Sequence, residues 1–186
     1  MYNFRMKIGV PKEIKNNEYR VGLTPNSVRE LVKNNHEVYI QKDAGSEIGF
    51  SNSEYKEAGA LIINNAAELY ECSELIVKVK EPIPEEFNYL NSKHTVFAYL
   101  HLAGDPKTGL ELAATGITGI ALETVTADDG TMPLLSPMSS IAGQLSIVVG
   151  SYHLLKPNRG MGTLIGAMSD VDRRVVTVIG AGVAGT

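Results

Sequence analysis

The sequence has only one cysteine, Cys72, in its 186 residues. A single cysteine cannot form a disulfide within the chain, which excludes a disulfide-stapled fold and favours a reducing compartment. We interpret Cys72 as a structural residue and not as a nucleophile. No apolar run approaches the ~18 residues of a membrane-spanning helix, and the first residues contain no apolar core of a signal peptide. We therefore expect a cytoplasmic protein without a membrane partner.

Positive charge is also scarce. The chain has 17 Lys and Arg against 21 Asp and Glu, a net charge of −4, so no basic surface for a nucleic acid is expected. The His, Cys and carboxylate residues do not occur at metal-ligand spacings, and we expect no metal site. With 44% apolar and 20% charged residues, the composition is that of a globular protein with a sizeable core.

What the sequence does contain is a regular alternation of β-branched apolar runs and short helical segments. The helices begin at recognisable signals, such as Thr24 as an N-cap with Pro25 at the first helical position. Strands that alternate with helices predict βαβ units and a parallel sheet covered on both faces. The fold class is therefore α/β, a Rossmann-like parallel sheet with flanking helices. We expect its strands at residues 6–10, 37–41, 61–63, 75–80, 95–100 and 117–122.

Residues 175–180 form another apolar run, which leads directly into Gly180-x-Gly182-x-x-Gly185. In a dinucleotide-binding domain the first glycine makes the tight turn. The second lets the backbone approach the pyrophosphate, and the third lets the next helix pack on the strand. We therefore expect a strand at 175–180 that starts a second, dinucleotide-binding Rossmann domain. The helix that would follow, and the acidic residue expected about 20 residues later, lie beyond residue 186, so we expect a truncated N-terminal portion.

Residues 141–155 are apolar on nearly every face, which predicts a helix buried between layers. We expect Ser136-Pro137 to break the chain and Ser139 or Ser140 to cap this helix. The domain boundary is placed at that break. Residues 1–138 then form one domain. Residues 139–186 form the linking helix and the truncated start of the dinucleotide-binding domain.

Ligands of an open α/β sheet bind outside the carboxyl ends of its strands. Three polar side chains follow strand ends: Arg20 after the first strand, Lys80 at the end of the fourth, and His101 directly after the fifth. The guanidinium offers a planar fork for a carboxylate, the ammonium can hold an oxygen, and the imidazole can exchange a proton near neutral pH. Together they suit a small carboxylate that carries a second polar group.

Each candidate has a structural alternative. Arg20 could be a solvated loop residue, and His101, in an apolar setting, could be a core histidine. Lys78 shares a strand face with Lys80, so either lysine could reach the site. Glu123, at the end of the sixth strand, could anchor a loop or cap a helix.

Six segments, spread in order along the whole chain, resemble alanine dehydrogenases. They are residues 9–25 (GVPKEIKNNEYRVGLTP), 77–82 (VKVKEP), 99–103 (YLHLA), 123–125 (ETV), 137–139 (PMS) and 180–185 (GAGVAG). Each motif alone is moderately specific, and together they are specific. The sequence is therefore similar to the alanine dehydrogenase/pyridine nucleotide transhydrogenase family.

The resemblance implies NAD-dependent oxidative deamination of L-alanine to pyruvate and ammonia, and the reverse amination. It places the substrate on Arg20, Lys80 and His101, with Lys80 and His101 as catalytic residues and His101 as the acid–base group. The family's catalytic aspartate lies beyond residue 186, the N-terminal domain is the substrate domain, and hexamers are usual. The cofactor-binding residues that the resemblance implies are Met138, Ser139, Gly180, Gly182, Val183 and Gly185.

The sequence departs from the family at three places. Many members have an acidic residue at Ser140, an arginine at Gln144 and an aromatic residue at Leu122, which affects contacts near the cofactor cleft but not the substrate residues. The nearest alternative function is the NAD(H)-binding component of a proton-translocating transhydrogenase, which binds no amino acid. A second alternative is a non-catalytic remnant, which could fold or assemble but not turn over. We expect the 186-residue chain by itself to be inactive.

Overall fold

The computed structural model describes residues 5–166, 169–170 and 174–186. The chain divides into two compact units, Met1–Glu123 and Thr124–Thr186. Among the described residues, no helix combines the length and the apolar character needed to cross a membrane. The two units are described separately below.

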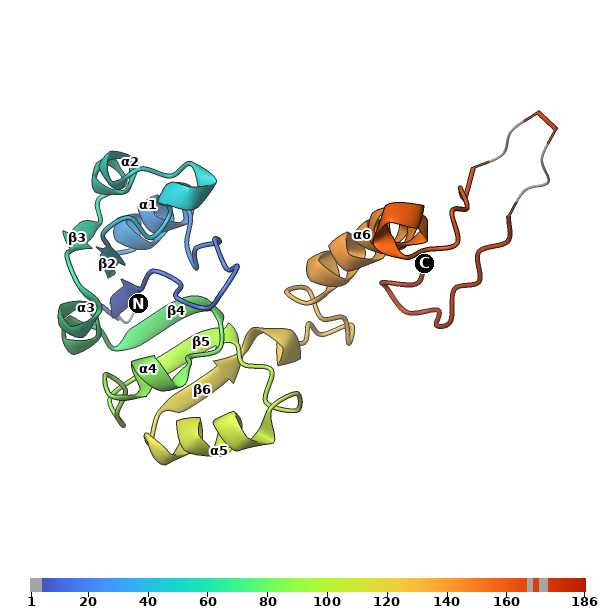
Figure 1. Ribbon diagram of the computed structural model, residues 1–186. Helices are drawn as coiled ribbons and strands as arrows, with labels where there is room; N and C mark the ends of the chain where they lie inside the picture. Colours follow the sequence, from blue (N-terminus) through green and yellow to red (C-terminus); the bar gives the residue numbers. More distant parts are fainter. Residues whose placement is uncertain (1–4, 167–168, 171–173) are drawn as a thin grey trace. The chain divides into compact units, whose positions relative to one another are not determined.

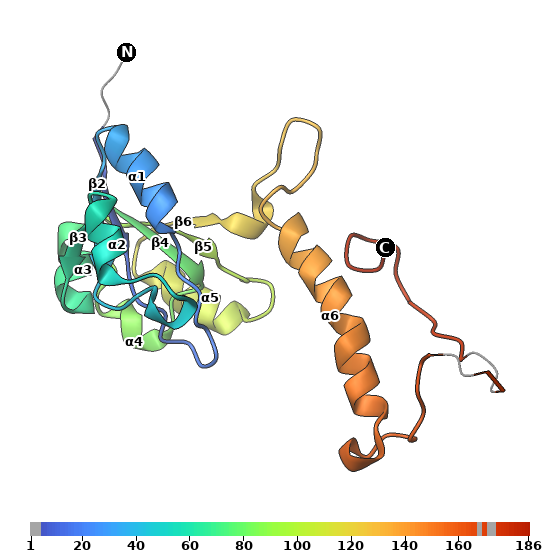
Figure 2. The same ribbon diagram turned by 90° about the horizontal axis from the view of Figure 1, so that it is seen from above.

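The first unit is built on one six-stranded sheet (Figures 1 and 2). The strand order is β3-β2-β1-β4-β5-β6, and every neighbouring pair is parallel. This confirms the predicted fold class and the doubly wound arrangement of a Rossmann-like sheet. The strands are β1 (Lys7–Val10), β2 (Glu37–Gln41), β3 (Leu61–Ile63), β4 (Leu75–Lys80), β5 (Thr95–Tyr99) and β6 (Thr118–Ala121).

The helices of this unit begin at the signals that the sequence carries. The Thr24 hydroxyl accepts a hydrogen bond from the Ser27 N–H at the start of α1, and Ser51 forms a capping box with Glu54 at the start of α2. Such caps satisfy backbone N–H groups that have no partner inside the helix. The helices are α1 (Pro25–Lys33), α2 (Asn52–Glu57), α3 (Ala66–Cys72), α4 (Pro84–Phe87) and α5 (Pro106–Ala114), with 3₁₀ turns η1 (Ser46–Ile48) and η2 (Leu122–Thr124).

Two hydrophobic clusters lie on opposite faces of the sheet. Val38 and Ile40 of β2 belong to one cluster, whereas Tyr39 between them belongs to the other, because successive strand residues point to opposite faces. Helices α1 and α2 contribute to the first cluster, and α3 and α5 contribute to the second. The sheet is therefore covered on both faces, as predicted, and its strand ends are left to carry the site.

The second unit contains α6 (Ser136–Leu154) and η3 (Lys156–Asn158). The prediction of a break at Ser136-Pro137 with a cap at Ser139 or Ser140 is wrong. The helix begins at Ser136, and Pro137 lies in its first turn, where the missing N–H would have had no partner inside the helix. Leu135, at the N-cap position, makes no side-chain capping hydrogen bond.

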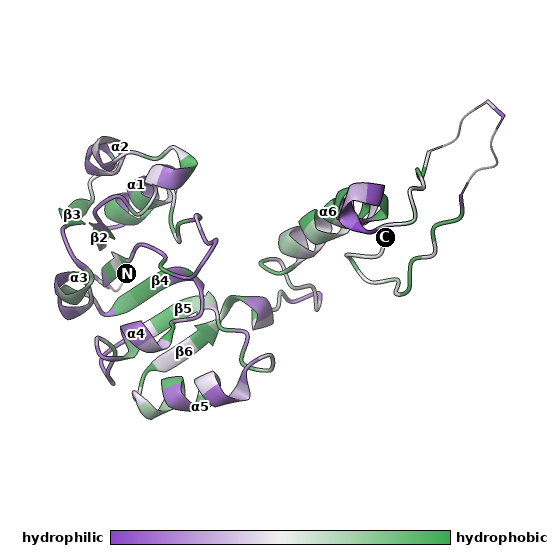
Figure 3. Ribbon diagram, viewed as in Figure 1, coloured by the Kyte–Doolittle hydropathy of each residue, from purple (hydrophilic) through white to green (hydrophobic). Residues whose placement is uncertain are grey.

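The prediction that this helix is buried between layers is also wrong. The helix is largely apolar (Figure 3). Its apolar side chains are exposed, with Ile141 at 49% and Val148 at 65% of full exposure. A helix with apolar residues on nearly every face needs neighbours on several sides. The following segment approaches one side of it, where a Cβ on Gly143 would lie 2.4 Å from the Ala184 carbonyl oxygen.

Residues 174–180 do not form the predicted strand. Val175 and Ile179 are 90% and 97% exposed. A β-strand is defined by hydrogen bonds to a neighbouring strand, and no strand of the described second unit lies beside these residues. The apolar run alone therefore does not produce a strand in this unit.

Candidate functional site

The site lies where the strand order reverses, between β1 and β4. From β1 the chain goes on to β2 and β3 on one side, whereas β4 is followed by β5 and β6 on the other. Ligands of such sheets bind outside the carboxyl ends of the strands at this point. Arg20 lies in the connection after β1, Lys80 is the last residue of β4, and His101 follows β5 by two positions. The topology therefore brings the three predicted side chains to one edge.

Arg20 lies in the connection after β1 and forms an ion pair with a neighbouring carboxylate. Its Nε and Nη2 donate to the two oxygens of Glu18, at 2.8 and 2.6 Å, and its backbone N–H donates to Glu18 at 3.0 Å. This bidentate pair raises the pKa of Arg20 and lowers the pKa of Glu18, mainly through the side-chain hydrogen bonds. The guanidinium is fixed in orientation while its side chain stays 47% exposed.

Lys80 lies close to this pair. Its positive charge contributes to lowering the pKa of Glu18, and its Nζ is 3.9 Å from the Glu81 carboxylate. Glu81 also forms an ion pair with Lys15, so Lys80 belongs to a network of alternating charges. With a side chain 31% exposed, it can reach a ligand at the strand end.

Lys78, the alternative lysine, has a different environment. Its side chain is completely buried, and its Nζ is 3.1 Å from Glu13 and 2.8 Å from Glu86. Although Lys78 and Lys80 lie two positions apart, the pairing of β4 with β5 shifts register between Val77 and Lys80, and one lysine is buried while the other is accessible. The contacts of Lys78 are those of a structural residue.

His101 is exposed, and the core alternative does not hold for it. Its backbone has a φ of +48°, a left-handed conformation that residues other than glycine adopt rarely. The Glu123 carboxylate accepts from the N–H of His101 at 2.6 Å and of Leu100 at 3.2 Å. Glu123 therefore has the loop-anchoring role, and it fixes the turn that carries the imidazole.

One small pocket connects the lysine end of the site with the histidine end. Glu81 and His101 both line it, together with Asp105 and Thr108 at the start of α5. The Thr108 hydroxyl and N–H donate to Asp105 and lower its pKa. Charge interactions thus link Arg20, Glu18, Lys80 and Glu81, and the pocket places Glu81 near His101.

Sequence reasoning missed the carboxylates that hold these cations. Glu13, Glu18 and Glu81 were not predicted to have a role, although the alternation of acidic and basic residues in 12–20 was a usable signal. Such a run is equally typical of a solvated loop. The partner of a carboxylate can also lie far along the chain, because Glu13 and Lys78 are 65 residues apart.

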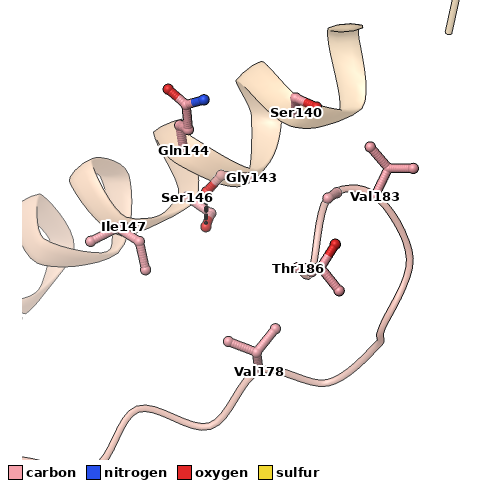
Figure 4. Close-up of a pocket in the computed structure, with 10 residues that line it drawn as sticks. Ser140, Gly143, Gln144, Ser146, Ile147, Val178, Val183 and Thr186 are labelled. Carbon is pink, nitrogen blue, oxygen red and sulfur yellow. Dashed lines mark hydrogen bonds between the residues drawn. The ribbon is translucent and has the colours of Figure 1, made fainter. Parts of the chain in front are cut away.

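The glycine turn forms a second candidate site, within the second unit. Gly180 has a φ of +118°, and the N–H groups of Gly185 and Thr186 donate to the Gly182 carbonyl. A pocket of about 530 Å³, here called the glycine-turn pocket, lies between this turn and α6. Figure 4 shows Val178, Val183 and Thr186 opposite α6; the lining residues are Ser140, Gly143, Gln144, Ser146, Ile147, Val178, Val183, Ala184, Gly185 and Thr186.

The predicted cofactor residues are only partly brought together there. Val183 and Gly185 line the glycine-turn pocket, whereas Met138 and Ser139, in the first turns of α6, do not. Gly180 and Gly182 shape the turn without lining the pocket. The volume is in the range of small-molecule sites, and among the described residues no cluster of metal-ligating side chains is found.

Comparison with protein families matches both parts of the chain. Residues 9–142 match the model described as alanine dehydrogenase/PNT, N-terminal domain, and residues 146–186 match alanine dehydrogenase/PNT, C-terminal domain. Among curated proteins, the alanine dehydrogenases of Mycolicibacterium smegmatis and Bacillus subtilis are 48% and 46% identical, each over 97% of this chain. The chain spans about half the length of these relatives, 48% and 47% respectively.

Two solved structures are similar to this one. An L-alanine dehydrogenase matches with a TM-score of 0.85 and 44% identity, covering 97% of this chain and 50% of that chain. A transhydrogenase from Sinorhizobium meliloti matches with a TM-score of 0.73 and 25% identity, covering 96% of this chain and 53% of that chain. The similarity to the dehydrogenase is greater in both sequence and structure.

Proposed function

This chain belongs to the alanine dehydrogenase/PNT family. We propose that the whole protein, here called the full-length chain, oxidises L-alanine to pyruvate and ammonia with NAD. It would also catalyse the reverse amination. The observation that carries the proposal is the placement of Arg20, Lys80 and His101 at one edge of the sheet. Each has a carboxylate nearby: Glu18 binds the Arg20 guanidinium, Glu81 lies 3.9 Å from the Lys80 Nζ, and Glu123 binds the backbone N–H of His101. A small 2-oxo acid presents the groups that this set can bind.

In this proposal Arg20 binds the substrate carboxylate through guanidinium N–H groups other than the two that donate to Glu18, and Glu18 keeps the guanidinium in one orientation. Lys80 holds the oxo oxygen of pyruvate as a point charge. His101 donates a proton to that oxygen as it leaves as water during amination, and removes a proton from the water that adds to the same carbon during alanine oxidation. Binding the acid at two points aligns it for the reaction, which in general lowers the activation free energy by roughly several kcal/mol.

The glycine turn fits a dinucleotide, and NAD, when bound, would accept the hydride from the substrate α-carbon. Gly180 has the positive φ that a tight turn requires, and Gly143 leaves room for the turn to approach α6. We propose that Gly180, Gly182, Val183 and Gly185 hold the cofactor. Met138 and Ser139 would contact it once the full-length chain closes around it.

We further propose the organisation that the family resemblance implies. Residues 1–138 form the N-terminal part of the substrate domain, and residues 139–186 form the linking helix and the start of the NAD-binding domain. The matches to the N- and C-terminal family models, which meet between residues 142 and 146, support this division. The proposed assembly is a homo-oligomer, a hexamer by family resemblance, in the cytoplasm, without a membrane or nucleic-acid partner.

The test is an assay of the purified full-length chain with L-alanine and NAD, following NADH absorbance, and with pyruvate, ammonia and NADH in reverse. Turnover in both directions is expected. A protein that binds NADH but neither turns over nor binds pyruvate would instead fit the transhydrogenase component. A polypeptide of these 186 residues alone is the matched control and should be inactive, because it spans only about half the length of its alanine dehydrogenase relatives. Activity from it would contradict this expectation.

A further inference from the structure

The connection between β1 and α1, residues 11–24, is attached to β4 on both sides of Arg20. Before Arg20, the Glu13 side chain reaches β4. After Arg20, the backbone of Gly22 packs so closely on β4 that an added Cβ would lie 2.5 Å from the Val77 carbonyl oxygen. The position of Arg20 relative to Lys80 therefore depends on how this connection sits on the strand.

Glu13 makes the polar half of this attachment. Its Oε1 accepts hydrogen bonds from the backbone N–H of Val79 at 2.7 Å and of Lys80 at 3.3 Å. Among the described residues, the ladder between β1 and β4 pairs Ile8 with Leu75 and Gly9 with Ile76 and continues no further. The carboxylate thus binds N–H groups at a strand end that β1 no longer covers.

The second oxygen of Glu13 is equally engaged. Its Oε2 accepts from the Lys78 Nζ at 3.1 Å, and the same ammonium donates to Glu86 at 2.8 Å. The Tyr70 hydroxyl donates to Glu86 as well, at 2.8 Å. With side-chain exposures of 0% for Lys78, 2% for Glu13 and 5% for Glu86, the cluster is shielded from solvent, so its geometry is tightly held.

We propose that Glu13 is a positioning residue that sets the distance between Arg20 and Lys80, so that both can bind one small 2-oxo acid. It does not touch the substrate itself. The connection contains Arg20, and the Glu13 carboxylate attaches this connection to the backbone of Lys80. The Lys78 ammonium holds the other oxygen of the same carboxylate in place. The substrate part of this inference rests on the proposed function; the attachment itself does not.

The kinetic test uses the full-length chain with Glu13→Gln and Glu13→Asp. Glutamine cannot accept from Lys78 and from both backbone N–H groups at once, and aspartate keeps the charge but is one methylene too short to reach both. For each variant we expect kcat/KM for pyruvate to fall about tenfold or more, since misplacement by an ångström can cost about 10²-fold. The KM for NADH should stay within about twofold, because the glycine turn that would bind the cofactor lies outside this cluster.

The matched control is Glu86→Gln. It removes a carboxylate from the same Lys78 ammonium but leaves the contacts to Val79, Lys80 and the connection in place. We expect a lowered unfolding temperature in Glu86→Gln, as in Glu13→Gln, with kcat/KM for pyruvate within about threefold of the unaltered enzyme. Equal kinetic losses in the Glu13 and Glu86 variants would overturn the positioning role, because the cluster would then act through stability alone.

A second measurement does not depend on turnover. Amide hydrogen exchange at Val79, Lys80 and residues 12–22 should become faster in Glu13→Gln and stay unchanged in Glu86→Gln. If the unaltered full-length chain has no alanine dehydrogenase activity, the proposed function fails while this exchange still decides the attachment. Unchanged exchange in Glu13→Gln would overturn the inference even in an active enzyme.

Discussion

The carboxylate of Glu123 accepts a 2.6 Å hydrogen bond from the backbone N–H of His101, 22 residues earlier in the chain. His101 sits at a φ of +48°, a conformation costing roughly 1–2 kcal/mol for an L-residue. The carboxylate therefore stabilises an unfavourable turn. The position of the imidazole thus depends on Glu123, in the 3₁₀ turn η2 that follows β6.

Replacing Glu123 should loosen this turn without removing the imidazole. In the full-length chain, Glu123→Ala should lower kcat for pyruvate amination by about tenfold or more, because both N–H groups of the turn lose their acceptor. Glu123→Gln retains one acceptor oxygen and should show a smaller loss. Steady-state kinetics with both variants checks this order, and a fully active Glu123→Ala enzyme would show that the turn is held by other contacts.

Removing the imidazole should affect turnover far more than cofactor affinity. For His101→Ala we expect kcat to fall about 10²-fold or more, the usual contribution of a general acid–base group. The Kd for NADH should be nearly unchanged, as measured by fluorescence titration. A near-normal kcat in this variant would assign His101 a structural role.

Lys80 and Lys78 should respond differently to the same change. Lys80→Met should raise the KM for pyruvate strongly or abolish activity, with little effect on the unfolding temperature. Lys78→Met leaves two buried carboxylates without their cation and should destabilise the fold by about 3–5 kcal/mol, while activity at low temperature falls less. Thermal unfolding together with kinetics separates the two, and similar profiles for both lysines would contradict the division between site and cluster.

Arg20→Lys tests whether the fork geometry matters. A lysine can bind Glu18 only as a point charge, so the two parallel hydrogen bonds at 2.8 and 2.6 Å are lost. We expect the KM for pyruvate to rise about tenfold or more. The charge-neutral Arg20→Gln provides the comparison, and an Arg20→Lys enzyme with an unaltered KM would return Arg20 to a loop role.

Stability should depend on pH through His94. Burial lowers the pKa of His94, whose Nδ1 accepts from the Asn91 N–H at 3.1 Å while Nε2 lies 2.8 Å from the Tyr70 carbonyl oxygen. Because the folded pKa lies below the ordinary value of about 6.5, the contribution is fully present above that value and is lost as pH falls through the folded pKa. Guanidinium unfolding between about pH 7.5 and about pH 5 should show this loss.

The control for this pH dependence is His94→Asn, which cannot gain a proton in the same range. Its stability should be lower at neutral pH and should change less between the two pH values. An equal change in both proteins would assign the pH dependence to other groups, such as the paired carboxylates.

The sheet was predictable because its signals are local. The apolar runs of β1 to β6 and the cap at Thr24 depend on a few neighbouring residues, and each was confirmed. Residues 175–180 carry the same kind of run but form no strand, because pairing requires a partner that no local pattern supplies. For α6 the pattern identified a helix but not its neighbours.

The placement of the three candidate side chains was predictable, and their partners were not. Arg20, Lys80 and His101 follow the ends of parallel strands, which meet at one edge of the sheet. Their binding of a substrate stays a prediction. The choice between Lys78 and Lys80 could not be made, since a fully buried lysine is rare and its two carboxylates come from distant parts of the chain. Burial of a charge is decided by tertiary contacts, which a single strand pattern does not contain.

Because the backbone at His101 is left-handed, the residue that would make this turn most stable is not the histidine that it contains. Glycine would occupy the same φ at almost no cost, so folding alone would favour the residue that removes the imidazole. Under the acid–base role that we propose for His101, selection for turnover would retain the less favourable residue, and without that role stability would favour glycine at this position.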